Sequence, residues 1–337
     1  MFKLTALPVG HGDTYCLETD SAVIVFDSGP TNHEAAFIEK VETLAEEGRQ
    51  VDLLVISHID DDHIAGILRF IKTQRKALSH FKEIWFNGRE HLNSTNVETF
   101  DVQQGVLLGA HLEKFSGWNQ SFSTNAVCIE NMTSPIKIGE MEVTILSPTL
   151  HKLDRLAGHW DQTIKKREEA TQQKALKRLG KEDFAVVSPQ KPPAIDQSKP
   201  NGSSIAICVK YKDRFVVLCG DAHPGVLTDS LKSNSSSHGK FDIVALPHHG
   251  SAANVTETFL EFFSASNYLI STDSSKPNRP DLRSLELILN ASTCGETKLW
   301  FNYEPPQEIK TWLDKHAKDK LTWGYGNSSD GITITLE

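Results

Sequence analysis

The sequence predicts an α/β fold, and three observations lead to this prediction. Residues 51–56 form an apolar run rich in β-branched side chains, which is typical of a buried strand, and residues 64–71 follow with the pattern of a helix. A succession of strand, strand, helix, strand and helix runs from residue 14 to residue 71. Several histidines and aspartates stand in the turn after residues 51–56, which is where open α/β sheets place their chemistry.

The first part of the chain is expected to supply a hairpin followed by alternating helices and strands. Residues 2–9 have the pattern of a strand with a glycine turn, and residues 14–17 and 22–26 that of a hairpin. A helix is predicted over residues 34–47 with Gly48 as its stop, and a further strand over residues 83–86. This order is what the first half of an αββα sandwich should show.

Residues 87–200 are predicted to be an insertion within one domain that spans residues 1–337. The pattern predicts a helix over 97–112, a strand over 141–146 and a charged helix over 150–179. Basic side chains of the charged helix could contact phosphates, but Glu168 and Glu169 interrupt them, which favours a solvated face. Residues 188–200 carry several prolines and lysines and are predicted to form a mobile loop.

Regular structure is predicted to resume at Ser204. Residues 205–209 and 215–218 have the pattern of a hairpin that ends at Asp221, and residues 241–246 that of a buried strand that leads to His248. The remaining elements alternate between helix and strand and are expected at residues 256–263, 268–271, 282–290, 298–302, 306–315 and 331–336.

The turn after residues 51–56 holds two imidazoles and three carboxylates within six residues. These side chains are His58, Asp60, Asp61, Asp62 and His63. So many ionisable groups cannot be buried together without a counter-charge, and a metal cation supplies one. A polar turn with unrelated histidines is the alternative, but the density of ligand-type side chains favours a metal site.

This run resembles the signature loop of the metallo-β-lactamase fold, with Asp60 in the place of a second histidine. Three further motifs occur in the order that this fold shows. They are a strand end with Asp27, a strand that delivers Asp221, and the Pro-His-His-Gly-Ser run at residues 247–251. The resemblance implies a four-layer αββα sandwich with a helical insertion.

A narrower resemblance links the chain to the hydrolase domain of the competence protein ComEC and its soluble relatives. It rests on Val-Gly-His-Gly-Asp at residues 9–13, on Asn201 and Ser204 before a strand, and on the His-His-Gly-Ser run. His11 replaces the usual glutamine, and Arg279 stands where this group often has a histidine before proline. Members of this group are usually regarded as metal-dependent phosphodiesterases or nucleases, and stand-alone relatives are associated with bacterial antiviral defence.

The resemblance also implies a ligand set for two divalent cations. His58 and Asp60 would hold one cation, Asp62, His63 and His248 would hold the other, and Asp221 would bridge them. Asp62 would also orient the attacking water, and Asp27 would support the metal loop from behind. The usual third histidine of the first site is replaced by residues 201–204, so carboxylate oxygens make up a larger share of the ligands, and both zinc and manganese fit.

Residues near this centre are candidates for contact with a substrate, and several have a simpler alternative. His249 would protonate the leaving oxygen or contact phosphate, or would only pack the loop. Ser251 would donate to a phosphate oxygen or cap the following helix, and Arg279 would bind phosphate or lie exposed in its loop. His11, Asn201 and Ser204 complete the predicted substrate-binding set.

Two cations that share a hydroxide are suited to the hydrolysis of phosphodiesters. The sequence therefore predicts a metal-dependent hydrolase, a phosphodiesterase or nuclease that acts on DNA or RNA. Hydrolysis of another ester, such as a small phosphodiester, a phosphorylcholine ester or a lactone, is the alternative within the same fold. A third alternative is a non-catalytic module that binds a partner protein or a second copy, which the near-complete ligand set disfavours.

Composition limits the partners. The formal net charge of −9 argues against tight, non-specific binding to long DNA, although a dinuclear metal centre is itself a strong local positive charge. No apolar run approaches the length of a membrane span and the N-terminus lacks a signal-peptide pattern, so a cytoplasmic location without membrane contact is expected. The five cysteines are odd in number and scattered, which fits a reducing compartment.

Overall fold

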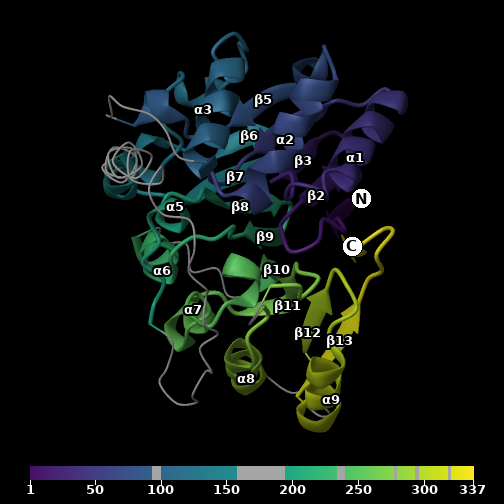
Figure 1. Ribbon diagram of the computed structural model, residues 1–337. Helices are drawn as coiled ribbons and strands as arrows, with labels where there is room; N and C mark the ends of the chain where they lie inside the picture. Colours follow the sequence, from purple (N-terminus) through teal and green to yellow (C-terminus); the bar gives the residue numbers. More distant parts are fainter. Residues whose placement is uncertain (93–99, 158–193, 234–239, 277–278, 293–295, 318–319) are drawn as a thin grey trace, which may run out of the picture.

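The protein folds into two β-sheets that pack face to face, with helices on both outer faces (Figure 1). The computed structural model describes residues 1–92, 100–157, 194–233, 240–276, 279–292, 296–317 and 320–337. The four layers confirm the α/β fold class and the αββα sandwich that the sequence predicts.

The first sheet has six strands in the order β14-β1-β2-β3-β4-β5. They are β1 (Phe2–Ala6), β2 (Tyr15–Thr19), β3 (Val23–Phe26), β4 (Val51–Val55), β5 (Phe81–Trp85) and β14 (Ile332–Leu336). β2 and β3 form the predicted hairpin, whereas β3, β4 and β5 run parallel. The last strand of the chain pairs with the first, so the predicted closing strand is confirmed.

The second sheet has eight strands in the order β13-β12-β11-β10-β9-β8-β7-β6. They are β6 (Ile136–Ile138), β7 (Met141–Ser147), β8 (Ala206–Tyr211), β9 (Arg214–Leu218), β10 (Phe241–Ala245), β11 (Ala265–Ile270), β12 (Thr297–Phe301) and β13 (Leu321–Tyr325). β8 and β9 form the predicted hairpin, and β9 to β13 run parallel. Because β6 and β7 lie within residues 87–200, the segment predicted as an insertion also contributes two strands to this sheet.

Three apolar clusters hold the layers together. The inner faces of the sheets share one cluster, in which Leu4 and Ile24 of the first sheet lie with Ile207 of the second. The outer face of the first sheet is covered by α1 (Ala35–Glu46), α2 (Asp61–Thr73) and α3 (Phe100–Leu112). The outer face of the second sheet is covered by α6 (Pro224–Ser233), α7 (Glu257–Phe262), α8 (Leu282–Ala291) and α9 (Gln307–His316). Burial of such apolar side chains is the main force that holds sheets and helices together.

Short helical turns connect these elements. They are α5 (Lys199–Gly202), η1 (Ala77–His80), η2 (Arg89–His91), η3 (Gln120–Phe122), η4 (Ile129–Asn131) and η5 (Pro247–Gly250). None of the helices in the described ranges is long and apolar enough to cross a bilayer.

Helix α2 begins at Asp61, earlier than the predicted start at residue 64. Asp60 stands at its N-cap position, and Asp61 and Asp62 occupy its first turn. Carboxylates are stabilised there because they face the positive end of the helix dipole. Most of the His/Asp cluster therefore lies on the first turn of a helix, which fixes the directions of its side chains.

The central segment differs from the prediction in part. Residues 150–157 are helical as predicted, but residues 158–179 of that helix and residues 188–193 of the predicted mobile loop lie outside the described residues. In the described end of that loop, the side chain of Asp196 packs against the protein and is only 8% exposed, whereas Ile195 is 56% exposed. Helix α6 and strands β6 and β13 were not predicted; β6 has only three residues, and Gly324 interrupts β13.

Candidate metal centre

The candidate site lies at one edge of the sandwich, where the carboxyl ends of parallel strands from both sheets meet. Asp27 directly follows β3, and the loop after β4 carries His58. In the other sheet, Asp221 lies just beyond β9 and His248 just beyond β10. The two sheets thus bring together side chains that are far apart in the sequence.

The backbone at several of these positions is in the left-handed region. φ is 60° at Asp27, 51° at His248 and 55° at His249. Each such non-glycine residue costs on the order of 1 kcal/mol or more, and such residues cluster at functional sites. Gly220 has φ of 50°, and a Cβ there would lie 2.6 Å from Ser204 Oγ, so only glycine fits before Asp221.

Two buried imidazoles are held through Nδ1 and present Nε2 to the centre. His63 Nδ1 lies 2.7 Å from Asp27 Oδ2, and the other oxygen of that carboxylate accepts the N–H of Ser57 at 2.7 Å. His249 Nδ1 donates to the carbonyl of Ser271 at 3.0 Å. A neutral ring with its hydrogen on Nδ1 has a free lone pair on Nε2, so both rings can bind a cation.

Two further imidazoles have the same arrangement. His58 Nδ1 lies 2.9 Å from Ser57 Oγ, and His248 Nδ1 lies 3.1 Å from Asn254 Oδ1. His58 is buried, whereas the side chain of His248 is 23% exposed. The four rings therefore approach the centre from segments that follow strands of both sheets, and His248 forms its more open side.

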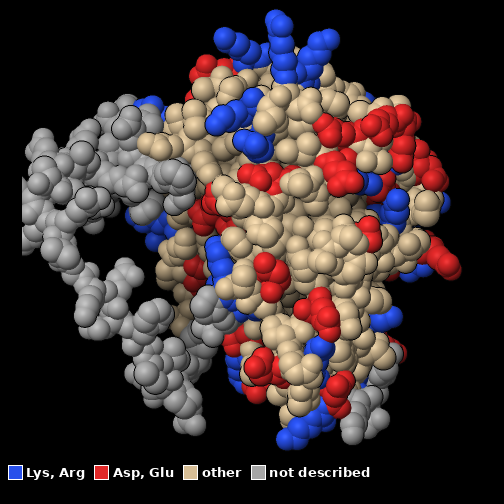
Figure 2. Space-filling model, turned by 45° about the vertical axis from the view of Figure 1, so that its right-hand side comes forward, with Lys and Arg blue, Asp and Glu red and all other residues tan. Residues whose placement is uncertain are grey.

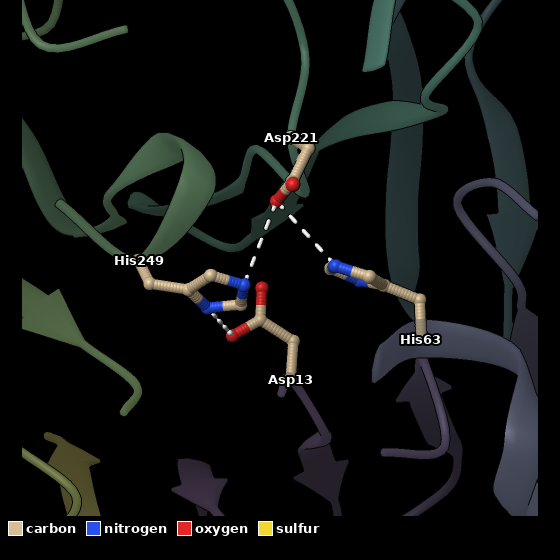
Figure 3. Close-up of side chains that lie close together, drawn as sticks. All are labelled: Asp13, His63, Asp221 and His249. Carbon is tan, nitrogen blue, oxygen red and sulfur yellow. Dashed lines mark ion pairs between the residues drawn. The ribbon is translucent and has the colours of Figure 1, made fainter. Parts of the chain in front are cut away.

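Asp221 lies between the four rings and divides them into two pairs. Its Oδ1 is 3.5 Å from His63 Nε2 and 3.9 Å from His249 Nε2 (Figure 3). Its Oδ2 is 3.4 Å from His248 Nε2 and 4.0 Å from His58 Nε2. A carboxylate with one oxygen toward each pair has the geometry of a bridge between two cations. The distances group His248 with His58, whereas the sequence placed it with His63.

Two carboxylates of the signature loop lie beside these pairs. Asp60 Oδ2 is 3.6 Å from His58 Nε2. Asp62 Oδ1 is 3.9 Å from His63 Nε2, and its Oδ2 is 3.8 Å from His249 Nε2. Each pair of rings thus has a carboxylate of its own.

Asp13 is a member of the cluster that the sequence did not single out. Its Oδ1 lies 3.3 Å from His249 Nδ1 and accepts the hydroxyl of Tyr15 at 3.0 Å. One ligand-type atom from each of Asp13, His63, Asp221 and His249 lies within 4.8 Å of the other three (Figure 3). The motif at residues 9–13 contained this aspartate, but only the packing of the two sheets brings it to the centre.

The residues present fit divalent cations. Nε2 of His58, His63 and His249 and Oδ1 of Asp221 are buried without a hydrogen-bond partner in the described part of the chain. A buried polar atom without a partner costs about 1–3 kcal/mol. Imidazole nitrogens and carboxylate oxygens are the donors that zinc and manganese accept, so cations at this place would satisfy these atoms.

The pKa values show that this cluster has an excess of negative charge. Burial disfavours the charged form of His249, yet Asp13 and other carboxylates raise the pKa of His249 to about 9. Burial likewise opposes charge on His63, yet Asp27 and its neighbours raise the pKa of His63 well above its usual value. Burial alone would raise the pKa of Asp62, but the adjacent histidines hold it well below its usual range. The carboxylates therefore attract positive charge, which metal cations supply.

Two basic side chains lie at the rim of the centre. Lys276 Nζ is 3.3 Å from Asp62 Oδ2, and Arg279 Nη2 is 3.1 Å from His248 Nε2. Both residues follow β11. His11 is partly exposed beside them, and burial together with the charge of Lys276 lowers its pKa. Arg279 and His11 thus lie near the centre, and their contact with a substrate stays a prediction.

Two predicted substrate contacts lie behind the centre. Ser204 is fully buried, and its hydroxyl accepts the N–H of Asp221 at 3.1 Å. Ser251 is also buried, and its hydroxyl accepts the N–H of Ala253 at 3.3 Å, while Thr256 caps helix α7. These places differ from those expected of substrate contacts, because both hydroxyls are buried and bonded to the backbone. Ser204 supports the strand end that carries Asp221.

Asn201, the remaining predicted substrate contact, leads to a second residue that the sequence did not single out. Asn201 Nδ2 donates to Asp196 Oδ2 at 2.8 Å, and Asn254 Nδ2 donates to the same oxygen at 3.0 Å. Burial would raise the pKa of Asp196, but His248 and these donors hold it well below its usual range. No local pattern marks Asp196, because it lies in a stretch rich in proline and lysine.

Comparisons with known proteins agree with this architecture. Residues 7–116 match the family model described as the Metallo-beta-lactamase superfamily. That match covers β2 to α3, including the motifs with Asp27 and His58–His63. No curated protein matches the chain.

Solved structures with a similar chain course include three of different description. The metallo-beta-lactamase fold protein YhfI from Bacillus subtilis is 11% identical, with a TM-score of 0.47 over 99% of this chain and 98% of that one. A diphosphatase from the PhnP family is 11% identical, with a TM-score of 0.42 over 100% and 98%. CmlA, a diiron β-hydroxylase from Streptomyces venezuelae, is 12% identical, with a TM-score of 0.44 over 99% of this chain and 54% of that one. At these sequence identities and TM-scores, the substrates and metals of these proteins are not inferred for this chain.

Proposed function

We propose that this protein is a metal-dependent hydrolase of phosphodiesters, with DNA or RNA as the substrate class. The observation that carries this proposal is that two basic side chains lie at the rim of the candidate metal centre. Lys276 and Arg279 come from one loop and face Asp62 and His248 at 3.3 and 3.1 Å. Lysine and arginine so placed suit a substrate that carries negative charge next to the bond to be cleaved, which a lactone does not.

Each side of Asp221 would hold one divalent cation. His63, His249 and Asp62 would hold the first, and His58, His248 and Asp60 the second. Two cations held there supply a hydroxide nucleophile at neutral pH and neutralise charge that develops on a phosphoryl oxygen. The chain itself fixes the directions of the four imidazoles through their Nδ1 atoms. In this assignment His249 belongs to the ligand set rather than acting as the proton donor predicted from the sequence.

Surface charge bears on the form of the nucleic acid. The formal net charge is −9, and Figure 2 shows basic side chains at the upper end of one face with acidic side chains beside them. Proteins that bind long duplexes tightly carry a basic face. We therefore assign recognition of the substrate to the basic side chains at the rim, Lys276 and Arg279, which favours single strands or chain ends over long duplexes. A role in bacterial antiviral defence and a cytoplasmic location stay predictions from the sequence.

The proposal is tested with metal-depleted protein supplied with Mn²⁺, Zn²⁺ or neither. The substrates are single-stranded DNA, RNA, plasmid DNA, bis(p-nitrophenyl) phosphate and a lactone. We expect hydrolysis of phosphodiesters only with a divalent cation, with Mn²⁺ at least as effective as Zn²⁺, because carboxylate oxygens stand where a third imidazole would favour zinc. Full activity in saturating EDTA would contradict a metal-dependent reaction. Activity on the lactone alone would replace the phosphodiester with another ester.

A further inference from the structure

The ring of His248 is contacted on both of its nitrogens. Nδ1 lies 3.1 Å from Asn254 Oδ1 and 3.4 Å from Asp196 Oδ2. Nε2 lies 3.4 Å from Asp221 Oδ2 and 3.1 Å from Arg279 Nη2. A neutral imidazole carries one hydrogen, so these contacts decide which nitrogen keeps the lone pair that a cation needs.

The contacts of Nδ1 are fixed by a carboxylate that can only accept. Asp196 Oδ2 accepts the amides of Asn201 and Asn254 at 2.8 and 3.0 Å, and its Oδ1 accepts the N–H of Ser198 at 2.8 Å. Because Asn254 must turn its NH₂ group toward the carboxylate, its Oδ1 faces Nδ1 of His248. Nδ1 thus meets two acceptor oxygens and must carry the hydrogen. The amide of Asn201 also approaches Nδ1, but its contact there is 3.4 Å against 2.8 Å to Asp196.

The other side of the ring gives the same result from its hydrogen bond, because Arg279 Nη2 is 3.1 Å from Nε2 whereas the acceptor Asp221 Oδ2 is 3.4 Å away. The guanidinium of Arg279 can only donate, so its contact with Nε2 requires a lone pair on that nitrogen. The acceptor-only Asp196 and the donor-only Arg279 therefore impose the same tautomer of His248 from opposite sides.

We propose that Asp196 is a positioning residue for His248. Through the carboxamides of Asn201 and Asn254 it keeps the hydrogen on Nδ1, so that Nε2 is presented to the second cation position. The part of this inference that concerns cations rests on the proposed function, whereas the tautomer is a property of the chain alone. Removal of such outer partners of a histidine ligand weakens metal affinity by about 10–100-fold.

The first experiment measures the tautomer in metal-free protein by long-range ¹⁵N–¹H correlation of labelled histidine, at alkaline pH where imidazole is neutral. His248→Gln identifies the signals. We expect the Nδ1–H form in the wild-type protein. In Asp196→Asn the Nε2–H form should gain population, because an amide at 196 can donate to the carboxamides. An Nε2–H form in the wild-type protein would overturn the inference, whether or not Asp196→Asn folds.

The second experiment measures the affinity for Mn²⁺ and Zn²⁺ by competition with a chelating dye. The matched control is Asp242→Asn, since Asp242 is also a largely buried acceptor, bonded to Phe215 N–H at 2.8 Å, but lies on β10 away from the centre. Asp196→Asn should lower the affinity for the second, or more weakly bound, cation by about 10–100-fold, and Asp242→Asn should leave this affinity unchanged. Equal affinities in wild type and Asp196→Asn would overturn the role in cation binding. If the wild-type protein binds no cation, the proposed function fails, and the tautomer still decides the role of Asp196.

Discussion

Neighbouring aspartates on the first turn of α2 should have opposite effects when each is replaced by alanine. Asp62 points into the candidate metal centre, with its carboxylate 3.3 Å from Lys276 Nζ and 3.8 Å from His249 Nε2. Asp61 points away and accepts hydrogen bonds from the N–H and hydroxyl of Thr31 at 3.0 and 2.6 Å. Asp62→Ala should remove activity with little change in stability, and Asp61→Ala should do the reverse.

The loss expected for Asp62→Ala follows from its place among the ligand-type atoms. Without this carboxylate, one cation loses a ligand and the nucleophile loses the group predicted to orient it. We expect kcat to fall by about a thousandfold or more, which corresponds to about 4 kcal/mol of transition-state stabilisation. The free energy of unfolding of the metal-free protein should change little, because the histidines that lower the pKa of Asp62 keep other carboxylate partners, Asp27 for His63 and Asp13 for His249.

Asp61→Ala serves as the matched control on the same helical turn. It loses both bonds to Thr31 and the bond from Gln104 Nε2 at 2.7 Å. At partly exposed positions these bonds together stabilise the protein by about 1–3 kcal/mol. We expect a lower urea midpoint and a kcat within about threefold of wild type at temperatures where the variant is folded.

Urea denaturation and turnover of bis(p-nitrophenyl) phosphate measure both variants. A folded Asp62→Ala protein that keeps near-normal turnover would refute the assignment of this carboxylate. Equal loss of kcat in both variants would show that the effect comes from disturbance of the helix end. The reasoning from side-chain direction would then be wrong.

Three further outcomes are expected. Glu18 is buried, which opposes its charge, but Lys40 and other basic side chains lower its pKa. Its contribution to stability is therefore present above the unfolded pKa of about 4.3 and is lost as pH falls through the folded pKa. Glu18→Gln should reduce this loss of stability at acid pH in urea titrations, and an unchanged pH profile would contradict the reasoning. Gly66→Ala should destabilise the protein by about 1–3 kcal/mol in the same assay, because a Cβ there would lie 2.0 Å from the carbonyl oxygen of Ser28, and wild-type stability would show that the helix can move aside. Arg279→Ala should raise KM for a phosphodiester several-fold while kcat changes less, and an unchanged KM would exclude contact with phosphate.

The sequence predicted the architecture because its strands are buried on both faces. In β4, Leu53 and Val55 face the second sheet and Leu54 faces the helices, so residues 53–56 form a continuous apolar run after Asp52. The motifs with Asp27 and Asp221 follow directly from such runs. Their positions could therefore be predicted from local pattern alone. The specific relationship to ComEC is not tested by the family match, which covers residues 7–116.

The rest of the site depends on contacts between distant segments and on backbone conformations that follow neither helix nor strand periodicity. Asp13 reaches the centre because its N–H donates to the carbonyl of Asp62 at 3.2 Å, a contact between a loop and the first turn of α2. His248 and His249 follow one another in the left-handed region, and neither helix nor strand periodicity says where such side chains point. The grouping of His248 with His58 could for this reason not be read from spacing.

Charge balance connects this grouping to the number of cations. The carboxylates of Asp13, Asp60, Asp62 and Asp221 lie among the four imidazoles, while the basic side chains of Lys276 and Arg279 lie at the rim. One divalent cation would neutralise half of the charge of these four carboxylates and would leave one oxygen of Asp221 facing a pair of imidazoles without a partner. Two divalent cations match the charge and use both oxygens. The arrangement of the chain therefore favours a dinuclear centre over a mononuclear one, independently of the family to which its first third is similar.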